Sequence, residues 1–600
     1  MTFSGPHRQR GFFLNHLPEV TSITDLAYGR DPYLDAWLLH FMTENNLEHL
    51  IAPDKNASFD QLRFLVDLDE GQFFAPCTDW MLDNLLSSEM TTELRNEYRS
   101  TWRKLIRLIR HIPLDPYLRR KIVALCRFKF QNTLRYPFVI PSRLLKWLMT
   151  IFLSQSALQD PYQELKMRYN LRARDFMRTP LYKRFISACP SSTMGCERIQ
   201  DLRWQLDILE FKRLFCLSTW NAIWEKDNFT PDPDVVDREI NRDWTDFEQI
   251  MTDKFGSQSR GMKILYMPNS AGGILFDLMI IQAFHRLGHK VILALKEGFY
   301  YDYPILWDYE SDPVLFDFLN DARIIEDSNI SKNDLLDALR ANDLVIISDG
   351  TRERLNMYRT SITFARAWKE ADVVIAKGNG NYRRLIHSSH HFTRDILAFC
   401  RDDEDMVQFS YKSKSPRVQV HSEKDLVLKA EKIKRQMAKA KENGQKVMFY
   451  SAIVGSIPGQ TQTAIRILNT FVDYLRDKLE KTYIINPAEH FEPGMDADDL
   501  MYMWEIVQRS GLLDIWRFQT VNDIETSFDL MGEKIPPVWA GKDATYSTGC
   551  TKEMQIALDV QQKYPEMQII GPNPERFFRR REYGIGKFFD ASMDRRFVRR

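Results

Sequence analysis

The residues best suited to chemistry follow a short β-branched run at positions 371–376. This run is followed by polar and small residues: Lys377, Gly378, Gly380, Asn381 and Arg383. The pattern is typical of a buried parallel strand that ends in a polar loop. Glycines allow the backbone to approach a ligand closely, while a lysine and an arginine can hold an anion. We interpret the segment as a phosphate-binding loop; a strand-end turn with a surface lysine is the alternative.

Three further polar loops follow predicted strands. The first carries Asn269 and Gly272 just before a helix, where backbone N–H groups favour an anion. Its spacing matches neither a dinucleotide-binding fingerprint nor a P-loop. The second loop carries Asp302 and the third carries Asp349. Strand ends with Asn, Asp, Asp and Lys are suited to a divalent cation together with a phosphate, because such cations prefer oxygen ligands.

A histidine-rich segment follows the lysine loop, with histidines at 387, 390 and 391. Three histidines within five residues could bind a metal. We favour a surface loop, because no carboxylate spacing supports a closed site there.

The composition limits the classes of function. A chain of 600 residues predicts two or three domains, and 44% hydrophobic residues are enough to fill their cores. Lys+Arg and Asp+Glu are both 82, which gives no support to nucleic-acid or membrane-surface binding. Seven cysteines without a CxxC pair indicate reduced thiols. No apolar run reaches about 20 residues, and residues 1–10 lack an apolar signal core. We therefore expect a cytoplasmic protein.

Periodicity divides the chain into three regions. Residues 1–255 are predicted to be helical, because apolar residues recur at spacings of three and four in segments separated by prolines, at 94–112, 116–130, 142–153 and 198–224. Residues 256–421 alternate strands and helices, which predicts a mostly parallel sheet. Residues 422–600 repeat that alternation and end in a tail where arginines and phenylalanines interleave. The predicted fold class is α/β, a three-layer, mostly parallel sheet with a helical N-terminal region and a C-terminal α/β extension.

The expected elements of the second and third regions are as follows. Strands are predicted at 263–267, 291–295, 323–325, 344–348, 373–376, 447–450, 482–485, 515–518 and 568–570, and helices at 274–287, 313–319, 333–339, 362–369, 423–443, 461–478, 496–509 and 551–563. The third region is either a second domain or a continuation of the first sheet. For the tail, a docked, solvated segment is favoured over nucleic-acid binding.

Three phrases, in the expected order, resemble a known family. Residues 372–385, D-V-V-I-A-K-G-N-G-N-Y-R-R-L, are similar to the phrase D-L-V-I-x-K-G-x-x-N-[YF]-x-x-L of the damage-control phosphatase family, in its acidic-residue-methyltransferase-like branch. The segment 296–302 resembles the family's basic residue followed by an acidic metal ligand. Residues 160–170 are similar to its D-P-Y-x-x-x-K-x-x-x-N helix. The resemblance covers residues 155–400.

The first loop departs from the family pattern D-N-x-G-E-I-V-F-D. In one register, Asn269 and Ser270 replace the two metal ligands; in another, Pro268 replaces the aspartate. A charged metal ligand is missing in either register, which should weaken the binding of a divalent metal. Asp302 remains, and Asp349 could substitute. The resemblance therefore supports the fold more strongly than it supports activity.

The resemblance implies a metal-dependent phosphatase that acts on a sugar phosphate or a damaged phosphometabolite. A divalent cation (Mn, Mg, Co or Ni) would be held by Asn269 and Asp302, and Asp302 or Asp349 would position the attacking water. The phosphate would be held by Lys377, Gly378, Asn381, Arg383 and Gly272. The expected partner is a small phosphorylated metabolite, with no nucleic acid and no membrane; the oligomeric state is left open.

Two other functions compete with this one. Two successive α/β regions and the Gly-rich first loop are similar to the two-domain glycosyltransferase architecture, in which the loop 455–461 would contact a nucleotide diphosphate. The alternative for that loop is an ordinary helix start. The second competitor is a non-catalytic member of the phosphatase-like fold that binds a phosphometabolite or a partner protein, and the altered first loop favours it.

Overall fold

The computed structural model describes residues 17–578, apart from residues 19, 21, 48–54, 70, 88–89, 136–137, 188–197, 228, 243, 245, 257–260, 403 and 458. Residues 1–10 and most of the basic and aromatic tail lie outside the described residues. The chain divides into two compact units, Met1–Arg417 and Val418–Arg600. The predicted helical region and the first predicted α/β region both fall in the first unit. No described helix is both long and apolar enough to cross a membrane.

The first unit begins with the predicted helices. Their formation follows from local signals: in α5 the hydroxyl of Thr91 caps the N–H of Leu94, and Leu94, Tyr98 and Leu105 are buried along one face. The single helix predicted from Arg198 to Trp224 is wrong, because α10 ends at Ser218 and a separate turn follows. The elements are η1 (Ile23–Asp25), α2 (Pro32–Asn45), α3 (Phe59–Leu62), α4 (Asp79–Leu86), α5 (Thr92–His111), α6 (Pro116–Arg135), α7 (Pro141–Ser156), α8 (Gln163–Met177), α9 (Pro180–Ser187), α10 (Ile199–Ser218), α11 (Ala222–Glu225), α12 (Pro233–Asn241) and α13 (Phe247–Phe255).

A seven-stranded sheet forms the centre of this unit. Its order is β3-β4-β2-β1-β5-β6-β7, parallel throughout except for the antiparallel pair β6–β7. The predicted parallel sheet is confirmed, but β6 and β7 were not predicted. The elements are β1 (Lys263–Met267), α14 (Gly273–Arg286), β2 (Lys290–Leu295), α15 (Asp308–Ser311), α16 (Pro313–Leu319), β3 (Arg323–Ile325), α17 (Lys332–Ala341), β4 (Leu344–Ser348), η2 (Met357–Arg359), α18 (Ile362–Glu370), β5 (Val373–Lys377), α19 (Asn379–Ile386), β6 (Asp395–Arg401) and β7 (Val407–Lys412).

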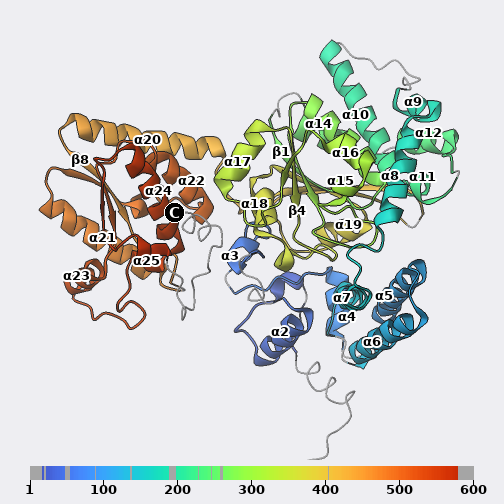
Figure 1. Ribbon diagram of the computed structural model, residues 1–600, viewed down its shortest axis with the longest axis horizontal. Helices are drawn as coiled ribbons and strands as arrows, with labels where there is room; N and C mark the ends of the chain where they lie inside the picture. Colours follow the sequence, from blue (N-terminus) through green and yellow to red (C-terminus); the bar gives the residue numbers. More distant parts are fainter. Residues whose placement is uncertain are drawn as a thin grey trace, which may run out of the picture. The chain divides into compact units, whose positions relative to one another are not determined.

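Helices cover both faces of the sheet, which makes the three predicted layers. Successive residues of each strand point to opposite faces, so Leu265 belongs to one apolar core and Tyr266 to the other. The core with Leu265 includes residues of α2–α7, α17 and α18. The core with Tyr266 includes residues of α8, α10 and α12–α14. Figure 1 shows α2–α7 in blue at one side of the sheet and α9–α12 in teal at another.

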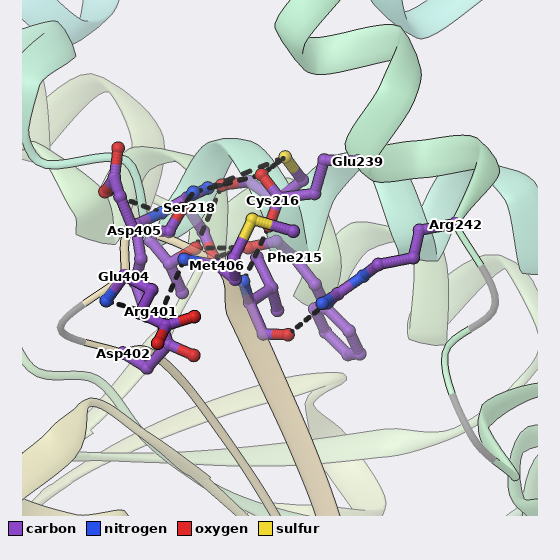
Figure 2. A network of polar contacts seen from close by, with 12 residues as sticks. Phe215, Cys216, Ser218, Glu239, Arg242, Arg401, Asp402, Glu404, Asp405 and Met406 are labelled. Atoms are coloured by element: carbon purple, nitrogen blue, oxygen red, sulfur yellow. Dashed lines mark hydrogen bonds and ion pairs between the residues drawn. The ribbon is translucent and has the colours of Figure 1, made fainter.

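A polar network fastens α10 and α12 to the β6–β7 pair. The guanidinium of Arg401, at the end of β6, donates to Glu239 Oε2 at 3.0 Å and to the carbonyl of Cys216 at 3.1 Å. Glu239 Oε1 also accepts the N–H of Val407 at 2.6 Å. Figure 2 shows Arg401, Glu239 and Cys216 meeting at this point. The polar groups of Arg401 and Glu239 are bonded to other groups of the network, so we assign the network a structural role.

The second unit is a separate α/β unit, not a continuation of the first sheet. Its sheet has the order β11-β10-β8-β9, and every pair is parallel. The four predicted strands are found, whereas α23 was not predicted. The elements are α20 (Glu423–Glu442), β8 (Lys446–Ser451), α21 (Thr461–Lys478), β9 (Thr482–Ile485), η3 (Pro487–His490), α22 (Ala497–Gln508), β10 (Ile515–Phe518), α23 (Val521–Met531), η4 (Ala544–Tyr546), α24 (Thr548–Lys563), β11 (Gln568–Ile570) and α25 (Glu575–Phe578).

Candidate active site

The four polar loops lie at one edge of the seven-stranded sheet. Strands β4, β2, β1 and β5 are consecutive neighbours and parallel, so their carboxyl ends meet. A small cavity lies where they meet, with a volume of about 10 Å³, enough for one water molecule. It is lined by Met267, Pro268, Ala294, Leu295, Lys296, Tyr303, Pro304, Asp349, Leu355 and Asn381. The sequence therefore predicted correctly that the loops converge.

The first loop packs directly against two of the others. The N–H of Ala271 donates to the carbonyl of Asp302 at 2.7 Å. Gly378 has a φ of +91°, and a Cβ atom there would lie 2.5 Å from Asn269 Nδ2. Only glycine fits at that position, because both its backbone conformation and its neighbour exclude a side chain. Asn269 and Asp302, the two residues predicted to hold a metal, therefore belong to loops in mutual contact.

Lys377 is fully buried and does not face an open cavity. Its ammonium lies 2.8 and 2.9 Å from the two oxygens of Asp277, which also accepts the hydroxyl of Tyr266 at 2.8 Å. Burial lowers the pKa of Lys377 and raises that of Asp277, and the attraction between the two charges opposes both shifts. A Cβ atom on Gly273 would lie 2.7 Å from the lysine nitrogen. Lys377 thus packs against Gly273 at the start of α14. Its predicted phosphate contact stays a prediction.

Asp302 is the site carboxylate that stands apart. Among the described residues it forms no ion pair, although Lys166 and Lys104 are near enough to influence it. Burial raises the pKa of Asp302 from 3.8 to about 6, partly opposed by those two charges. Burial also raises the pKa of the neighbouring Tyr162 to about 12, with a further contribution from Asp302. Asp302 is consequently ionised above pH 6 and available to a cation or a proton.

Two other carboxylates at this edge are neutralised by lysines. Asp349, predicted as a second catalytic residue, lies 2.6 Å from the ammonium of Lys296, and both side chains are buried. Asp308 lies 2.6 Å from the ammonium of Lys166, which also pairs with Asp160 at 2.6 Å. Burial raises the pKa of Asp308 to about 6, against the effect of Lys166. A divalent cation approaching Asp349 or Asp308 would therefore meet an ammonium group already in place.

Helix α8 completes the site from the helical region. The amide of Asn170 donates to Asp312 Oδ2 at 2.7 Å, and its oxygen accepts the N–H of Gly272 at 2.5 Å. The N–H of Gly272 is thus already bonded, which weighs against its predicted phosphate contact. Reasoning from sequence did not identify Asp308 and Asp312 as members of this edge. The available signal was that Asp308 and Asp312, which follow strand β2, are four residues apart. Their partners Lys166 and Asn170 are also four residues apart.

The remaining predicted residues are dispersed. Asn381 lines the cavity and donates to the carbonyl of Lys377 at 3.0 Å, whereas the side chain of Arg383 is exposed on α19. His390 is buried and accepts the N–H of Ala75 at 3.1 Å, and burial lowers its pKa to about 3. His387 and His391 are exposed. His390 is therefore a neutral structural residue.

Sequence and structure comparisons place the chain in a family. A family model described as the damage-control phosphatase ARMT1-like domain matches residues 74–418. The chain belongs to this family. One solved structure similar to the chain is a DUF89 family protein from Pyrococcus horikoshii, with 19% identity and a TM-score of 0.36 over 51% of this chain and 90% of that chain. No curated protein sequence matches the chain. The resemblance expected from residues 155–400 is confirmed.

Damage-control phosphatases generally depend on a divalent metal. Within the described residues, no group of three or more His, Cys, Asp and Glu side chains gathers as a metal site. Asn269 Oδ1 accepts the hydroxyl of Ser270 at 3.3 Å and keeps a free lone pair. One carboxylate and one amide do not form a closed metal centre. They do fit a sparse Mg²⁺-type site, which keeps its waters and recruits substrate phosphate oxygens.

Proposed function

We propose that the first unit is a phosphatase that releases phosphate from a sugar phosphate or a damaged phosphometabolite. The observation that carries the proposal is Asp302, a half-buried carboxylate beside the first loop to which no lysine of the described part of the chain is bound. Family membership supports the same class of reaction. It also favours a phosphatase over the glycosyltransferase alternative for residues 74–418.

The residues around Asp302 can perform different parts of the phosphatase reaction. Asp302 and the amide oxygen of Asn269 would hold a divalent cation, which would supply Lewis-acid polarisation of the phosphoryl group. Lys104 and Arg354 bring positive charge to the same place, since the charge of each acts on the other and Asp302 acts on Lys104. These cations would bind the phosphate dianion and stabilise the charge that develops on its oxygens. Above pH 6 the ionised Asp302 can also accept a proton from an attacking water.

The Lys296–Asp349 pair lines the cavity. Lys296 Nζ also donates to the hydroxyl of Thr351 at 2.9 Å, and that hydroxyl contacts both oxygens of Asp349. A fully bonded pair of this kind holds the loop rigidly and carries no net charge. Asp349 is therefore better suited to shaping the cavity than to activating water.

The test is phosphate release from glucose 6-phosphate, fructose 1-phosphate and ribose 5-phosphate. Each substrate is assayed with Mg²⁺, Mn²⁺, Co²⁺ or Ni²⁺ and with EDTA. Release that requires a metal, disappears in Asp302→Asn and persists in Asp337→Asn would support the proposal; Asp337 is an exposed residue on α17. Release that is unchanged in Asp302→Asn would contradict it.

A second candidate function is phosphometabolite binding without turnover. The two lysine–carboxylate pairs favour it, because they remove Asp349 and Asp308 from the set of available metal ligands. Calorimetry with the same sugar phosphates in EDTA distinguishes the two functions. Binding that is retained, with no phosphate release under any metal, would establish the binding function.

A further inference from the structure

A concentration of positive charge lies next to the Asp302 site. Its members come from α7, from the loop after β4, from η2 and from α19, and they are Arg143, Lys146, Arg352, Arg354, Arg359 and Arg384. Two carboxylates accompany these six cations. Glu353 is buried and pairs with Arg143 at 2.7 Å. Glu297 lies at the exposed rim, 3.8 Å from Arg352.

The cations are close enough to destabilise one another. Burial lowers the pKa of Lys146 to about 8, and Arg143, Arg352 and Arg359 act in the same direction against Glu353. Burial lowers the pKa of Arg384 to about 10, and Arg354 adds to the effect. Holding like charges together away from water is costly unless an anion compensates them. Of these described residues, Arg352 is exposed, and Glu353 is the one buried carboxylate that accompanies the other five cations.

Several donors of the cluster have no acceptor. Nη1 of Arg384, Nη1 of Arg359 and Nε of Arg143 are buried and without a hydrogen-bond partner among the described residues. The other side of the Arg384 guanidinium is fixed, because its Nη2 donates to the hydroxyl of Ser142 at 3.0 Å. Fixed guanidinium donors that lack acceptors match the oxygens of a phosphate group.

Arg354 joins this cluster to the Asp302 site. Its Nε lies 3.5 Å from the position of a Cβ atom on Gly380, beside the hydroxyl of Tyr303. The charge of Arg354 acts on Lys104 and also on Arg384, and the charge of Asp302 acts on Lys104 as well. The positive charge therefore continues from the reacting position to the buried guanidinium groups.

We infer that the ligand of this site carries a second phosphoryl group, bound by Arg359 and Arg384, while its first phosphoryl group lies at Asp302, Lys104 and Arg354. The ligand class is a small bisphosphorylated metabolite. This inference rests on the proposed function, because it specifies the substrate class of the same site. The single anion that a sugar monophosphate brings would leave the buried donors of Arg359 and Arg384 unpaired.

The experiment is calorimetric titration of the full chain in EDTA with fructose 1,6-bisphosphate and with fructose 6-phosphate. The bisphosphate is expected to bind about 10- to 100-fold more tightly, the effect of one or two charge-assisted hydrogen bonds. Arg384→Gln and Arg359→Gln should each reduce this preference about tenfold or more. The matched control is Arg286→Gln, which removes an exposed arginine at the far end of α14.

Thermal unfolding shows whether each variant is folded, and the Arg359 variant tests the inference if the Arg384 variant is not. Equal affinity for the two sugars, or a preference that survives in every folded variant, would overturn the inference. Because titration needs no turnover, a bisphosphate preference without phosphate release would refute the phosphatase and leave this inference standing. Phosphate release without that preference would support the phosphatase and overturn the inference of a bisphosphate ligand.

Discussion

Asp302 makes the stability of the first unit depend on pH in an unusual direction. Its pKa is about 6 in the folded protein and 3.8 when unperturbed, so the folded state binds the extra proton between these values. Stability therefore falls as the pH rises from 3.8 to 6, and the full penalty is present above pH 6. The shift corresponds to about 3 kcal/mol at pH 7.5, and to about half of that at pH 5.

Asp302→Asn removes the charge and keeps the shape of the side chain. The variant should be more stable than wild type by up to about 3 kcal/mol at pH 7.5, and the gain should shrink as the pH is lowered. The same variant should lose phosphate release. A gain in stability coupled to a loss of function is expected where a charge is retained for activity. Differential scanning calorimetry at pH 7.5 and pH 5 measures the gain.

Asp349→Asn is the matched control. It makes the same chemical change on the neighbouring loop, but it leaves the buried ammonium of Lys296 without its counter-charge. We expect a loss of about 3–5 kcal/mol, the opposite sign. A gain for Asp302→Asn that is equal at both pH values, or a loss at pH 7.5, would refute the electrostatic reasoning.

Three further predictions concern other buried groups. Lys377→Met should cost about 3–5 kcal/mol in calorimetry, and adding Asp277→Leu should recover most of it; a double variant no better than the single one would contradict the pairing. Gly378→Ala should cost at least about 1–3 kcal/mol, because a Cβ atom would press on Asn269; unchanged stability would argue against the packed loops. In the second unit, burial raises the pKa of Glu553 to about 7, so stability falls as the pH rises from 4.5 to 7. Glu553→Gln should raise the unfolding temperature at pH 8 clearly more than at pH 5.

The sequence predicted the elements well where local pattern decides them. The run at 373–376 forms β5, and the helix predicted at 461–478 is α21 with the same ends. Strands β6 and β7 were missed for different reasons. The outer strand β7 is only partly buried and lacks a uniform apolar run, whereas β6 carries one at Ile396–Cys400 that was not recognised. The break after Ser218 was missed because the apolar spacing continues through it.

The chemistry of the site was predicted less well, because pairing across the sequence decides it. Lys377 has the signature of an anion-binding lysine, yet its partner Asp277 lies 100 residues earlier in the chain. The sequence pattern around Asp349 indicates a free carboxylate. In the structure, however, Asp349 pairs with Lys296, which follows the neighbouring strand β2. Nothing in the local pattern distinguishes a paired charge from a free one. The convergence of the loops could be predicted, but the state of each charge could not.

The contacts of α8 also determine when this site can form during synthesis of the chain. Lys166 with Asp308 and Asn170 with Asp312 both join residues 142 positions apart. At about 5–20 residues per second, a ribosome needs about 7–30 s to supply those partners. Of the two folded-state partners of Lys166, Asp160 has then been made and Asp308 has not, and the N–H of Gly272 that bonds to the oxygen of Asn170 is also made later. The helical region is therefore made first, but its site-facing side is completed late, and the nascent chain passes through a stage with polar groups that have no final partners.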